Sequence, residues 1–170
     1  MSHVDNKVDW CLKKAEKELE GTGKHRGLIK VKPSKEQADK HIIKAKHYLD
    51  ATIHLKNGYF SDISASTVFY CMYQSLLAIA SKFGYESRNQ ECTFALIHFL
   101  IKDKKINLDK SLLDKIASFE PSQTPHDSTT IEIREQYQYG TSLSLEDDIY
   151  GQLLTLAKEV LSKAKEIIEE

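Results

Sequence analysis

Apolar side chains recur at helical spacing along most of the chain. In the first segment, which ends near Gly21, they step by three or four residues at Val8, Leu12, Ala15 and Leu19. In the second, which follows Ser34 and closes at Asn57-Gly58, they are Ala38, Ile42, Ala45, Leu49 and Ile53. Ser34 and Gln37 have the spacing of a capping box, and Asn57-Gly58 suits left-handed geometry. The pattern predicts two amphipathic helices.

The segment from about Ser61 to Phe83 is apolar around more than one face, which predicts a central helix with neighbours on several sides. Gly84 is suited to stop it, and Asn89 to cap a following helix that runs through Ile101. A shorter helix is expected at about 109–119. A final helix is expected to open at Ser144, with acidic residues in its first turn where they favour the helix dipole.

Three stretches lack this period. Residues 21–33, GTGKHRGLIKVKP, contain three glycines and read as a loop or mobile arm, and residues 120–130 read as a polar loop. The segment TIEIREQYQYG is ambiguous, because Ile131 and Ile133 alternate as in a strand while Arg, Glu and Gln favour a helix. It is predicted to be helical, since a single strand would have no partner.

These elements predict an all-α, up-and-down bundle of about five or six helices in one domain, residues 1–170. Its core is expected at about 36–168, and an N-terminal helix with a basic, glycine-containing arm, residues 1–33, precedes that core.

Composition places the chain among ordinary globular proteins, with 41% hydrophobic and 29% charged residues and a net charge of −1. No apolar run approaches a membrane span of about 20 residues, and the N-terminus lacks the order of a secretory signal. Three cysteines without a CxxC pair argue against a disulfide framework, so a cytoplasmic location without membrane contact is expected. The front of the chain is basic and its tail acidic. That fits either a surface facing nucleic acid or attraction between the two ends.

Motifs for common chemistries are missing from the sequence: there is no P-loop, no GxSxG and no HExxH. His47 and His54 are seven residues apart and read as solvated, so neither a metal site nor a cofactor is predicted. Cys71 reads as a small core residue. Cys92 falls in the first turn of a helix, where a thiol pKa can be lowered, but no base lies near it in sequence.

Two segments carry candidate ligand-binding residues. In GYESRNQECT, residues 84–93, capping explains Gly84 and Asn89 but leaves Arg88 and Gln90 unexplained. The other segment surrounds Arg134, whose guanidinium suits a phosphate. On a helix Tyr137 is its neighbour, and Tyr139 reaches it only if the helix ends at Gly140. The alternative for Arg134 is a surface ion pair with Glu132 or Glu135.

The run ATIHLKNGYFSDISASTVFYCMYQSLLAIASKFGYESRNQECT resembles the core of a HEPN domain (higher eukaryotes and prokaryotes nucleotide-binding). The turn at Gly58–Asp62 and the helix over Ala65–Ala80, with its alanines and tyrosines, carry most of the resemblance, which extends over about 36–168. It implies a homodimeric helical domain that binds nucleotide or RNA. Many such domains are metal-independent endoribonucleases, often toxins paired with a nucleotidyltransferase partner.

The HEPN signature is an arginine and a histidine with four to six residues between them, and this chain departs from it. Residues 93–95, after Arg88, are Thr-Phe-Ala, and His98 is too distant. After Arg134 a tyrosine, Tyr139, stands in the histidine position, as in some relatives. Because tyrosine is a poor base at neutral pH, the resemblance favours binding over cleavage.

Three functions therefore stay open. The first is a nucleotide- or RNA-binding module that uses Arg134, Arg88, Asn89 and the two tyrosines Tyr137 and Tyr139. The second is a metal-independent ribonuclease in which Arg134 stabilises the phosphate and Tyr139, or a spatially close His98, transfers protons. The third is a structural adaptor that uses residues 84–93 to recognise another protein.

Overall fold

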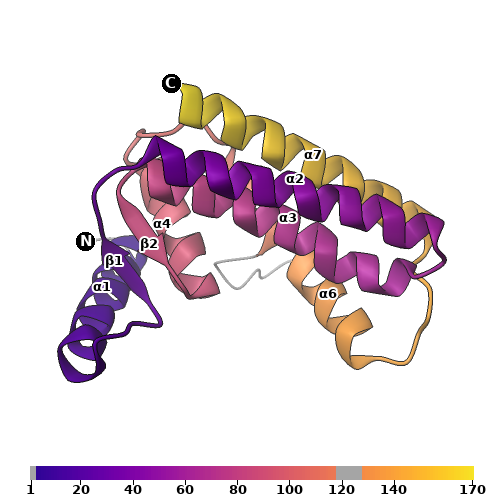
Figure 1. Ribbon diagram of the computed structural model, residues 1–170, viewed down its shortest axis with the longest axis horizontal. Helices are drawn as coiled ribbons and strands as arrows, with labels where there is room; N and C mark the ends of the chain where they lie inside the picture. Colours follow the sequence, from indigo (N-terminus) through magenta and orange to yellow (C-terminus); the bar gives the residue numbers. More distant parts are fainter. Residues whose placement is uncertain (1–2, 118–127) are drawn as a thin grey trace.

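The computed structural model describes residues 3–117 and 128–170. Seven helices and one short two-stranded ribbon form the described part of the chain, which confirms the all-α bundle (Figure 1). The helix number is slightly higher than expected. Most of the polar loop expected at 120–130, and the end of the helix expected at 109–119, lie outside the described residues.

Three long helices make the body of the fold: α2 (Lys35–Asn57), α3 (Ser61–Lys82) and α7 (Asp147–Glu169). They run side by side along the long axis of the molecule (Figure 1), and α7 packs on both members of the α2–α3 hairpin. The largest buried side chains of α3 are Val68, Phe69, Met72, Leu76 and Ile79. The prediction of a central helix is therefore confirmed.

Local sequence explains most helix boundaries. The Ser34 hydroxyl accepts from the Gln37 N–H at 3.1 Å, and the Asn89 side chain accepts from the Cys92 N–H at 3.0 Å, as predicted. Ser34 donates its own N–H to the Ser81 carbonyl, so Gln37 does not complete a capping box there. The left-handed residue after α2 is Tyr59, at φ 66°, and not Asn57 or Gly58.

The segment expected to be a loop or mobile arm, residues 21–33, is a loop over 23–27 and 31–33 but contains one strand of a β-ribbon. Strand β1 (Leu28–Lys30) pairs antiparallel with β2 (Tyr85–Ser87), and Leu28, opposite Ser87, is fully buried. Gly84 turns the chain into β2 at φ 79°, where an added Cβ would lie 2.8 Å from the Val31 carbonyl oxygen. Part of GYESRNQECT is thus a strand, whose partner lies about 57 residues earlier and could not be seen in local periodicity.

Helices α1 (His3–Thr22) and α4 (Gln90–Lys102) pack side by side at the end of the bundle that carries the ribbon. A disulfide joins Cys11 of α1 to Cys92 of α4, with the Cα atoms 5.9 Å apart. The expectation of unpaired cysteines is therefore wrong for this pair. Spacing could not reveal it, because 81 residues separate the two cysteines and only the tertiary packing brings them together. Cys71 is free and buried, as predicted.

The short helices α5 (Lys110–Ile116) and α6 (Thr130–Tyr139) complete the described elements. The helical interpretation of TIEIREQYQY is confirmed, and a reciprocal capping box between Thr129 and Glu132 starts α6. The last helix begins at Asp147 and not at Ser144. The residues before α7 are instead held against α3, because the Leu145 N–H donates to the Ser61 hydroxyl at 2.9 Å.

By length and composition alone, α3 could cross a membrane, but 67% of its most apolar window is buried within the fold. A central helix of a helical bundle has these same properties.

Candidate functional site

Arg134 is a buried arginine on the face of α6 that packs against α3. The residue is only 9% exposed, and its guanidinium carbon lies 4.4 Å from the centre of the Phe69 ring. Its Nε is buried and has no hydrogen-bond partner among the described residues. A planar cation over an aromatic face is a favourable contact, but it leaves hydrogen-bond donors unsatisfied. The site therefore holds a positively charged group with donors to spare.

Neither of the two carboxylates considered as partners for Arg134 forms a close ion pair with it. Glu132 accepts from the Thr129 N–H at 2.6 Å as part of the capping box. Glu135 places an oxygen 3.8 Å from the Arg134 Nη2, and half of that side chain is exposed. An ion pair of this kind contributes little in water. Arg134 is thus mainly positioned by packing on Phe69 and only weakly paired.

The two tyrosines of α6 differ in their surroundings. Tyr137 is partly buried against the core, whereas Tyr139 is 79% exposed at the last position of the helix. Gly140 follows directly, where an added Cβ would lie 2.5 Å from the Gln136 carbonyl oxygen. Helix α6 includes Tyr139 and is capped by Gly140, so Tyr139 lies about 140° around the helix from buried Arg134, on a different side. Tyr139 is accessible to a ligand, and Tyr137 chiefly packs.

An aromatic and hydroxyl chain runs from the platform under Arg134 towards the 84–93 segment. The rings of Phe69 and Tyr73 stack with centroids 5.8 Å apart, and the Tyr73 hydroxyl lies 3.1 Å from the Thr93 hydroxyl. Thr93 in turn donates to the Ser87 hydroxyl at 2.8 Å. Burial raises the pKa of Tyr73, so its hydroxyl stays protonated at neutral pH. Both rings pack in or against the core, and the sequence alone did not identify Phe69 as the partner of Arg134.

Arg88 lies in a different environment, at the junction of β2 and α4. More than half of its side chain is exposed, and its Nε donates to Glu86 at 2.9 Å. The same Glu86 oxygen lies 3.1 Å from the ring Nε2 of buried His25. The Asn89 side chain is used as the cap of α4. Many polar side chains of the 84–93 segment are therefore already hydrogen-bonded within the protein.

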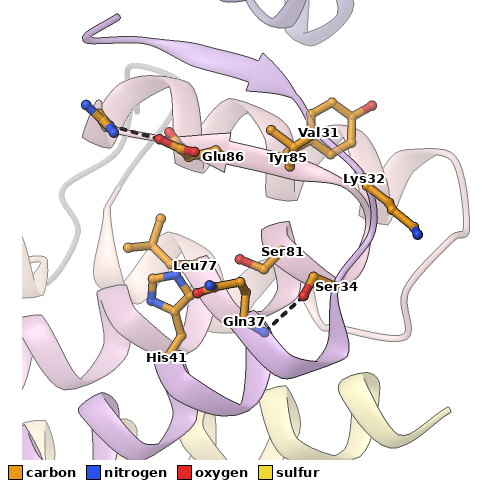
Figure 2. Close-up of a pocket in the computed structure, with 11 residues that line it drawn as sticks. Val31, Lys32, Ser34, Gln37, His41, Leu77, Ser81, Tyr85 and Glu86 are labelled. Carbon is orange, nitrogen blue, oxygen red and sulfur yellow. Dashed lines mark hydrogen bonds and ion pairs between the residues drawn. The ribbon is translucent and has the colours of Figure 1, made fainter. Parts of the chain in front are cut away.

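Arg88 also borders a hollow of about 570 Å³ between the ribbon and the helices (Figure 2). Figure 2 shows Glu86 and Tyr85 on the ribbon side, with Gln37, His41 and Ser81 facing them from α2 and α3. The His41 Nδ1 is 2.7 Å from the Gln74 side-chain oxygen, which fixes its ring. Arg134, by contrast, sits on α6 against Phe69. The structure does not bring the two arginines into one site.

The remaining candidates are less accessible. His98 is 5% exposed, and its Nε2 lies 3.7 Å from Asp114 of α5. This places it in the interior between α4 and α5, away from solvent. Cys92 is held in the disulfide and is not a free thiol. Within residues 3–117 and 128–170, no group of three or more His, Cys, Asp or Glu side chains is arranged to hold a metal ion.

Comparisons with known proteins assign no family to the chain. No protein-family model matches it, and no curated protein matches it.

Proposed function

We propose that this protein is a HEPN-type module that binds RNA or a nucleotide through Arg134. The observation that carries the proposal is the environment of that side chain: a buried guanidinium over Phe69, whose nearest carboxylate among residues 3–117 and 128–170 is at 3.8 Å. A phosphate could replace this weak ion pair by the close, charge-assisted contact that a guanidinium favours. The resemblance over residues 36–168 points to the same ligand class.

Tyr139 supplies the second contact of the proposed site. It is exposed and follows Arg134 by five residues at the end of α6, so its ring can stack on a base or its hydroxyl can donate to a phosphate. Tyr137 supports the helix from the core side. Arg88 contributes at most a peripheral charge, because Glu86 already engages its Nε. The site is proposed to need neither a metal nor a cofactor.

The same resemblance suggests the biological setting. The module is proposed to act as a homodimer beside a nucleotidyltransferase-like partner, in a toxin–antitoxin or defence context. The Cys11–Cys92 disulfide removes the ground on which a cytoplasmic location was expected. An adaptor role has one observation in its favour: the turn between α2 and α3 exposes Tyr59, Phe60 and Ile63, and Leu143 is exposed as well. Apolar side chains of this kind can bind a protein partner.

The binding test is a titration of labelled, mixed-sequence RNA with the wild-type protein, Arg134→Ala and Arg134→Lys at two salt concentrations. Arg134→Ala is expected to weaken binding about tenfold or more and to lower the salt slope by about one, while Arg134→Lys loses less because it keeps the charge. Thermal unfolding of each variant reports whether the fold survives. RNA affinity equal to wild type in a folded Arg134→Ala protein would contradict the proposal.

The same samples incubated with RNA in EDTA separate binding from cleavage. Binding without cleavage is the expected result, because no histidine stands beside Arg134 in the signature position. Metal-independent cleavage that is lost in both Arg134→Ala and Tyr139→Phe would instead make these two residues catalytic. Salt-insensitive binding to a protein, with no affinity for RNA, would replace both functions by the adaptor.

A further inference from the structure

Helix α1 carries its side chains in three sectors. Its apolar sector, with Val8, Cys11 and Ala15, is buried against the rest of the fold. A second sector carries both charges, with Asp9, Lys13, Glu16 and Glu20. The third sector follows positions 7, 10, 14 and 17, which step by three, four and three residues and so share one side of a helix. We call this third sector the lysine stripe: Lys7, Trp10, Lys14 and Lys17.

The centre of the lysine stripe is an exposed indole ring between two lysines. Trp10 is 50% exposed, and the ammonium groups of Lys7 and Lys14 lie 4.8 and 5.0 Å from the centre of its ring. Neither Lys14 nor Lys17 has an ion-pair partner among the described residues, and both are exposed. The ring is thus held between a paired cation, Lys7, and an unpaired one, Lys14, and its exposed part is available to an anionic aromatic ligand.

The stripe begins beside the α6 site. Lys7 and His3 border a hollow of about 400 Å³ together with Glu91 and Phe94 of α4 and Ile131 and Glu135 of α6. Glu135 is the residue next to Arg134. The two carboxylates in this hollow already face cations, since Glu91 accepts from Lys7 at 2.8 Å and Glu135 lies beside Arg134. A ligand on α6 can therefore continue onto α1.

We propose that the lysine stripe is a second contact for single-stranded RNA, which stacks a base on Trp10 and places neighbouring phosphates near Lys14 and Lys17. Unstacked bases are needed for such stacking, so single strands fit better than duplexes. From Lys7 to Lys17 the helix rises roughly 15 Å, enough for a few nucleotides. This inference rests on the proposed function and extends it from one arginine to a track.

An anionic membrane is the other surface that suits lysines around a tryptophan. The structure favours RNA because the apolar sector of α1 is used in the core, which leaves one ring for insertion. Helices that lie in a membrane interface bury a whole apolar face there. The stripe offers stacking and charge but no such face.

Trp10 is the single tryptophan of the chain, so its fluorescence reports on the stripe directly. The experiment titrates the full-length protein with short single-stranded RNA and follows both Trp10 emission and the anisotropy of labelled RNA. The variants are Trp10→Phe, the pair Lys14→Gln/Lys17→Gln, and Arg134→Ala. The matched control is Lys158→Gln/Lys165→Gln, which removes the same charge from exposed positions of α7.

The expected result is quenching of Trp10 that saturates with RNA binding. The Lys14/Lys17 pair and Trp10→Phe should each weaken binding about five- to tenfold, and the α7 pair should change it less than twofold. Arg134→Ala should lower affinity while quenching persists at higher RNA concentration.

The other outcomes separate the lysine stripe from the α6 site. RNA binding that depends on Arg134 but leaves Trp10 emission and the lysine variants unchanged overturns the stripe alone. Quenching with no effect of Arg134→Ala supports the stripe and overturns the α6 site. No RNA binding overturns both. A blue-shifted Trp10 emission with anionic vesicles, without any response to RNA, assigns the stripe to a membrane and overturns this inference.

Discussion

Two arginines in this fold show how differently the same side chain can be placed. Arg134 is nearly buried on α6, held over the Phe69 ring, and weakly paired. Arg88 is exposed at the ribbon, and a carboxylate two residues away engages its Nε. The first is packed in the fold with an unsatisfied Nε donor, and the second is solvent-exposed and has a close carboxylate partner. Before the fold is known, both are an arginine followed by polar residues.

The difference has a physical cause in the neighbouring elements. Helix α6 packs on the central helix, so its inward side chains meet aromatic rings and not water. Arg88 lies between the ribbon and α4, at the edge of the fold. The polar groups around it are already hydrogen-bonded within the ribbon and in the cap of α4. An anion gains more from the buried cation, because electrostatic interactions are less screened there. This comparison favours Arg134 as the ligand-binding residue.

The largest expected effect comes from removing the platform under Arg134. Phe69→Ala deletes a fully buried ring and should lower the free energy of unfolding by about 3–5 kcal/mol. Phe60→Ala is the matched control, since that ring is 55% exposed and should cost under about 1 kcal/mol. Urea unfolding measures both. Similar small losses for the two variants would show that Phe69 is not part of a packed core.

The disulfide between α1 and α4 stabilises the part of the fold that contains Arg88. Replacing Cys11 and Cys92 together by serine should lower stability by about 2–4 kcal/mol, because the bridge closes a long loop. The bond itself is tested by counting thiols in denatured protein. One reactive thiol is expected without reductant and three with it. Three thiols without reductant would show that the two cysteines are unpaired in the purified protein.

Gly84 tests the geometry of the turn before Arg88. Gly84→Ala should destabilise by about 1–3 kcal/mol, because φ is 79° and the new Cβ would lie 2.8 Å from the Val31 oxygen. Gly151→Ala is the control in the opposite direction. It lies within α7 with nothing within 4 Å of its added Cβ, so the same change should stabilise by up to about 1 kcal/mol. Equal effects at both positions in thermal unfolding would contradict the assigned turn.

The smallest expected effect is on the pH dependence of stability. It concerns Tyr73, whose ring stacks on Phe69 and whose hydroxyl contacts Thr93. Burial raises the pKa of Tyr73, and that of Cys71 to about 12. Between their ordinary and raised pKa values, these groups are still protonated in the folded state but already deprotonated in the unfolded state. The free energy of unfolding therefore falls as pH rises from about 9 towards 12. Tyr73→Phe should reduce that alkaline loss and leave stability near pH 7 little changed. An identical alkaline profile in the variant would remove Tyr73 from this account.

Helical periodicity predicted the bundle well, because caps and apolar stripes are local signals. The Ser34 and Asn89 caps and the helix around Arg134 are as the sequence indicates. The ribbon and the disulfide were missed for one shared reason: each joins segments far apart in sequence. The prediction that the last helix starts at Ser144 was wrong, because the Ser61 side chain, and not a local cap, holds Leu145.

The site was only partly predictable. Sequence spacing placed Tyr139 at the end of α6, but it could not show that Arg134 faces Phe69, since that contact crosses from α6 to α3. Arg88 seemed equally suited until Glu86 and His25 were placed beside it. The sequence analysis did not single out Trp10 or its lysines, because their exposure depends on which sector of α1 is buried.

The most direct test is a nitrogen-15 NMR titration that follows the arginine Nε–H signals while a short single-stranded RNA is added. Arg88 and Arg134 are then compared in one spectrum, and each signal is assigned by its lysine variant. The account predicts that the Arg134 signal shifts and saturates with binding, while the Arg88 signal moves little. A saturating shift of Arg88 with an unchanged Arg134 signal would contradict it and move the binding site to the ribbon.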